Sequence, residues 1–90
     1  MRLANADNFI LRELAGRFYL VNVKMRGHFC APLVLNETGA DILIPLLRGG
    51  NADDSAEYIA SEYGIGLDEA KSDVYAFLEQ MAEAGLELVS

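Results

Sequence analysis

Residues 33–43 read LVLNETGADIL, and the character of the chain changes within this stretch. The apolar triplet at 33–35 favours a short strand, since large apolar and β-branched side chains fit a half-buried sheet. Asn36 is a strong helix N-cap, and Glu37 supplies an acidic side chain where a first helical turn favours one. The stretch therefore predicts a strand that passes directly into a helix.

The segment before this junction has the composition of strands. Residues 8–23 contain two apolar runs, rich in aromatic and β-branched residues, that are separated by the Ala-Gly pair at 15–16. A short Gly-containing connection of this kind predicts a hairpin. Gly27 and Pro32 mark a loop before a third strand at 31–35. We therefore expect three short antiparallel strands in the first 35 residues.

The segment after the junction has a helical period. Apolar side chains recur every three to four residues and predict helices at 36–47, 56–63 and 68–84, of which the third has the clearest pattern. Strands followed by helices predict a small α+β domain, and the helical half has the dimensions of a helix-turn-helix trio. We expect residues 1–90 to form this single domain.

Local signals set the expected helix ends. Asp53, Asp54 and Ser55 are three alternative caps for the second helix, and Asp68 or a neighbour is expected to cap the third. Pro45 lies inside the first helix, where proline removes a backbone hydrogen bond and crowds the preceding turn. It predicts a kink or an early end.

The composition excludes several classes of protein. Hydrophobic residues make up 52% of the chain and charged residues 23%, which is typical of a folded globular domain. No apolar run approaches the roughly 20 residues that span a bilayer, so we expect a soluble cytoplasmic protein without a membrane partner. The net charge of −7 would repel phosphates, so we expect no nucleic-acid partner.

The sequence offers little catalytic or metal chemistry. His28 is the only histidine and Cys30 the only cysteine, so this pair cannot complete a tetrahedral metal site, and a Ser/His/Asp arrangement would have no histidine other than His28. Their loop, with Met25, Arg26 and Phe29, is better interpreted as a wing that touches a partner. We expect a protein that is not an enzyme and that needs no metal or cofactor.

Four stretches resemble the pyrroloquinoline quinone biosynthesis protein D (PqqD) family, whose domain is also called the RiPP precursor peptide recognition element. They are LRELAGRFYLVNV at 11–23, LVLNETGADIL at 33–43, the glycine at 49 or 50, and GLDEAKSDVYAFLEQMAEAGLEL at 66–88. The resemblance covers about residues 9 to 88, and its most specific pieces are LNETGA and the pattern of the last helix.

The resemblance implies a winged helix-turn-helix-like domain, with a three-stranded antiparallel sheet followed by three helices. It also implies a function: the domain binds the leader segment of a ribosomally made precursor peptide and presents it to a maturation enzyme, commonly a radical SAM protein. The leader adds as a strand to the edge of the third β-strand and lies in the groove between that strand and the last helix.

The candidate peptide-binding residues follow from this docking mode. The core stripe of the last helix centres near Val74, and either of its two flanks could face the groove. The candidates are Ala31, Leu33, Val34 and Leu35 on the strand, Lys71 and Tyr75 on one flank of the helix, and Asp73 and Gln80 on the other.

Two other functions are compatible with the predicted fold. A helical trio also occurs in DNA-binding winged helices, but residues 68–84 carry one Lys against five acidic residues, where a recognition helix needs basic or amide side chains. A structural subunit of a larger enzyme is the other alternative. An exposed edge strand could also pair two copies of the chain as a homodimer.

Overall fold

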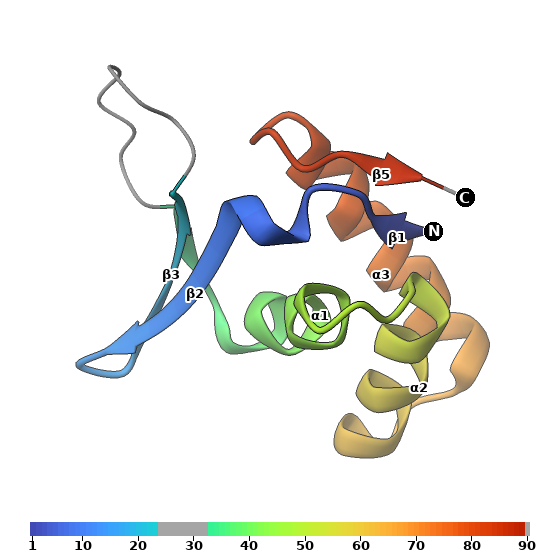
Figure 1. Ribbon diagram of the computed structural model, residues 1–90. Coiled ribbons are helices and arrows are strands. Elements are labelled where there is room, and N and C mark those ends of the chain that lie inside the picture. The colour runs from blue at the N-terminus through green and yellow to red at the C-terminus, as the bar shows by residue number, and fades with distance from the viewer. Residues whose placement is uncertain (24–32, 90) are drawn as a thin grey trace.

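The computed structural model describes residues 1–23 and 33–89 and has an α+β fold. A three-stranded antiparallel sheet is followed by three helices, as the sequence predicted (Figure 1). Several predicted features lie outside the described residues. They are the loop with Gly27 and Pro32, the proposed wing with Met25, Arg26 and Phe29, the pair His28 and Cys30, and the candidate site residue Ala31.

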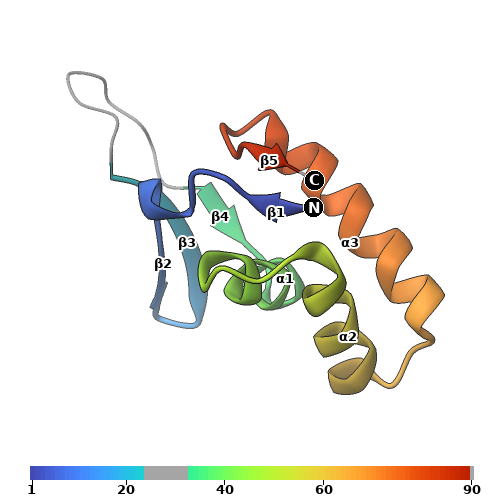
Figure 2. The ribbon, with the colours of Figure 1, turned by 45° about the vertical axis from the view of Figure 1, so that its right-hand side comes forward.

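The sheet is built on the predicted hairpin. Strands β2 (Phe9–Leu14) and β3 (Arg17–Asn22) pair from Leu14↔Arg17 to Phe9↔Asn22. Ala15 and Gly16 connect them with φ of 54° and 79°, the positive values that match a tight turn to the twist of the strands. Strand β4 (Leu33–Leu35) adds to β3, so the order is β2-β3-β4 and both β2 and β4 are edge strands (Figure 2).

Helix α1 (Glu37–Leu47) begins where the sequence predicted. The Asn36 side-chain oxygen accepts a hydrogen bond of 2.7 Å from the Gly39 backbone N–H, which confirms Asn36 as the N-cap. Pro45 lies in the last turn, and the helix continues to Leu47, the end that its apolar period predicted, so the early end expected from Pro45 does not occur. The Gly50 N–H donates to the Pro45 carbonyl at 2.9 Å as the chain leaves the helix.

The predicted caps of the other two helices were wrong. Helix α2 (Ala52–Tyr63) begins four residues earlier than expected, because Asn51 and Asp54 form a capping box in which each side chain accepts from the other residue's N–H at 2.9 Å. Asp53 and Ser55 lie inside the helix. Helix α3 (Leu67–Ala82) begins after Gly66 without a side-chain cap.

The acidic residues that were predicted as caps occupy first turns instead. Asp53 lies in the first turn of α2 and Asp68 in the first turn of α3. A carboxylate is stabilised there by the helix dipole without accepting a capping bond.

The two ends of the described chain pair with each other. Strand β1 (Arg2–Leu3) forms an antiparallel ladder with β5 (Leu88–Val89), and the two lie side by side in Figure 1. A short 3-10 turn, η1 (Ala6–Asn8), then leads into β2.

The core lies between the sheet and the helices. Phe9, Leu20 and Leu35 are buried on one face of the sheet, and Leu43 and Leu46 of α1 are fully buried. Helices α2 and α3 contribute further buried apolar residues, namely Ala52, Ala56, Ile59, Ala70, Val74, Leu78 and Met81. This packing fixes α1 and α3 relative to β4.

A surface contact joins α2 to α1. Tyr63, the last residue of α2, is 42% exposed. Its hydroxyl donates to the Asp41 carboxylate at 2.6 Å, so it ties α2 to α1 at the surface.

None of the helices in the described segments is both long and apolar enough to cross a membrane.

Candidate functional site

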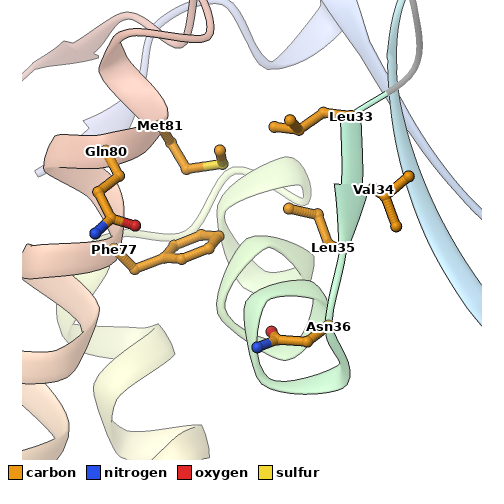
Figure 3. Close-up of a pocket in the computed structure, with 7 residues that line it drawn as sticks. All are labelled: Leu33, Val34, Leu35, Asn36, Phe77, Gln80 and Met81. Atoms are coloured by element: carbon orange, nitrogen blue, oxygen red, sulfur yellow. The ribbon is translucent and has the colours of Figure 1, made fainter.

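A groove of about 270 Å³ lies between the edge strand β4 and helix α3. Figure 3 shows the two walls facing each other across it. The lining residues are Leu33, Val34, Leu35 and Asn36 on one side and Phe77, Gln80 and Met81 on the other.

The hydrogen-bond pattern of the sheet shows which backbone groups of β4 face outward. The Val23 N–H donates to the Asn8 carbonyl at 2.8 Å, and in an antiparallel ladder every second opposed pair is bonded in this way. In the observed register, the bonded pairs between β2 and β3 then include Arg12↔Tyr19. Tyr19 therefore directs its backbone groups towards β2, away from β4.

The same alternation continues into β4. Phe18 and Leu20 direct their backbone groups towards Leu35 and Leu33, which lie opposite them. Val34, opposite Tyr19, therefore points its N–H and C=O away from β3. The open edge of β4 thus presents a backbone donor and a backbone acceptor at Val34.

The side chains of β4 divide between the two faces of the strand. Leu33 and Leu35 point from β4 towards α3, whereas Val34 points to the opposite face (Figure 3). Leu35 is buried at 8% exposure, while Val34 is 56% exposed. The strand therefore contributes side chains to the groove from Leu33 and Leu35, and its free backbone groups from Val34.

The glycine of LNETG has a steric role at the base of the groove. Gly39 is buried, and a Cβ atom built on it would lie 3.0 Å from Cε2 of Phe77 and 3.1 Å from the Asn36 side-chain oxygen. Both contacts are tighter than ordinary van der Waals contact. Glycine therefore lets α1 approach the Phe77 ring, which forms part of the far wall.

The structure brings together only some of the predicted site residues. Leu33, Val34, Leu35 and Gln80 line the groove. Asp73 is exposed on α3 one turn before Phe77, and it is not among the lining residues.

The other flank of α3 faces α2. The Tyr75 hydroxyl donates to the Asp53 carboxylate of α2 at 3.2 Å, and the negative charge of Asp53 raises the pKa of Tyr75. Lys71 is half-buried on the same flank, and neither residue lines the groove. The groove thus lies on the flank of α3 that carries Gln80.

Sequence reasoning missed four residues of the site. Asn36 and Gly39 were treated only as parts of a helix start, and Phe77 and Met81 only as core residues. The spacing of Phe77, Gln80 and Met81 at i, i+3 and i+4 places them on one helix face, which was the signal available in the sequence.

The groove is suited to holding an extended chain. Among the described residues, the lining side chains are apolar or amide groups, and none of them is titratable. A bound chain would therefore find van der Waals contacts, the side-chain amides of Asn36 and Gln80, and the backbone groups at the edge of β4. The described part of the chain contains no cluster of three or more metal-ligating side chains.

A comparison with protein-family profiles identifies one family. The family profile described as coenzyme PQQ synthesis protein D (PqqD) matches residues 31–86, which is more than half of the chain. This match includes β4 and all three helices, and therefore both walls of the groove. A search of curated protein sequences finds no match.

Two solved structures have similar folds. One is TbiB1 in complex with the TbiA(beta) leader peptide, with a TM-score of 0.75 and 19% sequence identity, covering 100% of this chain and 99% of that one. The other is lasso peptide synthetase B1 complexed with the leader peptide, with a TM-score of 0.68 and 26% identity, covering 98% of this chain and 96% of that one.

Proposed function

Because the chain belongs to the PqqD family, we propose that it binds the leader segment of a ribosomally synthesised precursor peptide and presents it to a modifying enzyme. The observation that carries the proposal is the open edge of β4, with the Val34 backbone groups directed outward beside a groove of α3. The two similar structures support it, since both are described as complexes with a leader peptide.

The leader would add to β4 as a fourth strand. Backbone hydrogen bonds to Val34 give affinity that depends little on the leader sequence, and alternate leader side chains enter the groove beside Phe77 and Met81. Specificity then comes from the shape of these side chains. Because the groove lining is uncharged, the affinity should change little with salt.

The chemical step belongs to the partner enzyme in this proposal. The chain supplies binding and orientation, and the enzyme acts on the peptide that extends from the bound leader. A radical SAM protein is the partner that we propose. Holding the leader on one edge strand leaves the rest of the peptide free to enter an active site.

A pair of tryptophan variants on α3 tests the proposed groove. Gln80→Trp places a large ring in the groove, whereas Ser72→Trp places the same ring on an exposed position of the same helix that does not line it. Both replaced residues are exposed, so both variants should fold. The assay is the fluorescence anisotropy of a labelled leader peptide from a precursor encoded beside the chain, with a scrambled peptide as control.

The two variants should separate clearly. We expect Gln80→Trp to weaken leader binding by about tenfold or more, since the ring competes for the volume that the leader fills, and Ser72→Trp to bind like the wild type. Equal affinity of the two variants would refute the groove as the binding site. Binding of the enzyme but of no leader by the wild type would favour the structural-subunit alternative.

A further inference from the structure

The sheet has a second open edge, on the strand opposite β4. Strand β2 ends the order β2-β3-β4, so in the described part of the chain one side of it is unpaired (Figure 2). The alternation that fixes Val34 also fixes this edge: Ile10 and Arg12 direct their backbone groups towards β3. Leu11 therefore directs its N–H and C=O outward, whereas the Phe9 N–H already donates to the Ala6 carbonyl at the end of η1.

A groove accompanies this edge as well. A cavity of about 430 Å³ is lined by Phe9, Ile10 and Leu11 of β2 and by Ile44, Leu47 and Arg48 at the end of α1. The arrangement repeats that of the β4 groove, which is lined by residues of an edge strand and by residues of one helix. Both edges of the sheet thus combine open backbone groups with an adjoining groove.

The second groove continues towards α2. An adjacent cavity of about 400 Å³ is lined by Ile44, Pro45, Arg48 and Tyr58, and it shares Ile44 and Arg48 with the first. Ile10 is 37% exposed and Tyr58 is 41% exposed, so apolar surface is accessible at both ends. A segment that added to β2 could therefore continue over the end of α1.

Arg48 gives this surface a specific chemical preference. Within residues 1–23 and 33–89, it is the one charged residue that lines either cavity, and its guanidinium pairs with no carboxylate. The chain as a whole carries a net charge of −7, and the carboxylates of Glu62, Asp41 and Glu37 act on Tyr58 in the adjacent cavity, so Arg48 is the positive group of this surface. A guanidinium in this setting binds a carboxylate with charge-assisted hydrogen bonds.

We propose that the β2 edge and this groove form a second strand-docking site, which binds an extended segment of the modifying enzyme. The segment carries apolar side chains at alternate positions and an Asp or Glu that pairs with Arg48. This inference rests on the proposed function, because it assigns the leader to β4 and the enzyme to β2.

The geometry allows both sites to be occupied together. The two edges are separated by β3 alone, so they lie roughly 10 Å apart, and two added strands would lie roughly 20 Å apart. The enzyme would then be held close to the leader without competing for its edge. This is the arrangement that presentation of a bound peptide requires.

Charge variants of the full chain test the second site. Arg48→Glu reverses the proposed contact, Arg48→Lys keeps its charge, and Arg2→Glu makes the same change in net charge on β1. All of these residues are exposed. The measurements are the affinity of each variant for the purified modifying enzyme encoded beside the chain, by biolayer interferometry, and for the labelled leader, by anisotropy.

We expect Arg48→Glu to weaken enzyme binding by about tenfold or more, because it replaces a charge-assisted contact with repulsion. Arg48→Lys should retain most of the affinity, and Arg2→Glu should bind like the wild type. Leader affinity should be unchanged in all three variants. In NMR spectra of the labelled chain, the enzyme should perturb residues 9–13 and 44–48.

Three results would overturn the second site. In the first, the enzyme does not bind the wild-type chain. In the second, Arg48→Glu and Arg2→Glu bind the enzyme with equal affinity. In the third, the enzyme shifts NMR signals of residues other than 9–13 and 44–48. Sedimentation that shows self-association of the wild type, lost in Arg48→Glu, would assign the surface to a second copy instead. The leader proposal fails separately, if the leader does not bind at residues 33–36, whether or not the enzyme binds.

Discussion

Replacement of Val34 by proline tests the backbone contact directly. The Val34 N–H faces away from β3, so Val34→Pro removes no hydrogen bond from the sheet. The side chain is 56% exposed and points away from the groove, so little packing is lost (Figure 3). The substitution should therefore leave the fold intact and remove a donor that only a bound strand would use.

The expected loss of affinity follows from that donor. Leaving the opposing leader carbonyl without its partner costs about 1–3 kcal/mol, which corresponds to a weakening of about 5-fold to 150-fold. The matched control is Val34→Thr, which keeps the N–H and the branched shape of the side chain. Leader anisotropy gives the affinities, and thermal unfolding followed by circular dichroism checks the fold.

Two results would refute this reasoning. If a folded Val34→Pro variant binds the leader like the wild type, the leader does not pair with β4 at Val34. If the variant unfolds at a much lower temperature than Val34→Thr, the Val34 N–H belongs to the sheet and the assigned alternation is wrong.

Further predictions concern the junction and the helices. Gly39→Ala should weaken leader binding, because its Cβ would displace the ring of Phe77 or the Asn36 side chain, while the higher helix propensity of Ala offsets part of the lost stability; anisotropy and thermal unfolding measure the two effects. Asn36→Ala should lose the cap bond and cost about 1 kcal/mol in the free energy of unfolding, measured with urea. The hydrogen bond to Asp41 raises the pKa of Tyr63 above 10.0 in the folded state. The stability that this bond contributes is therefore present below pH 10 and is lost as the pH rises through the higher folded-state pKa. Tyr63→Phe should reduce this loss of stability at alkaline pH, as measured by urea unfolding.

The sequence predicted those parts of the fold that depend on local signals. The positive-φ turn at Ala15 and Gly16, the cap at Asn36 and the apolar period of α3 each lie within a few residues, and the structure has all three. The cap of α2 was also local but was missed. Asn51 with Asp54 three residues later is a capping-box pattern, and the expected start was placed by the apolar residues instead.

Features that depend on long-range packing could not be predicted in the same way. The pairing of β1 with β5 joins the two ends of the chain through strands of two residues, which are too short to show a period. The side of α3 that faces the groove was likewise undetermined, because it depends on where α2 packs. Tyr75 meets Asp53 on α2, which leaves the Gln80 side for β4.

The candidate site was predicted only in part, because some of its residues come together through long-range packing. The candidate residues on the strand were predicted from the family resemblance and from the alternation of side chains along a strand. Leu33, Val34 and Leu35 do line the groove. The role of Gly39 required the position of Phe77, a residue far along the chain. Its contribution becomes visible only when α1 and α3 are packed.

An NMR titration of the labelled chain with the leader half of a precursor encoded beside it tests the central claim most directly. We predict that amide signals shift at residues 33–36 and at 77–81, with smaller changes at 9–11 on the other edge of the sheet, and that a scrambled leader shifts none of them. Shifts confined to β2 and the end of α1, or no shifts with any leader while the modifying enzyme binds, would contradict the claim that β4 and α3 receive the leader.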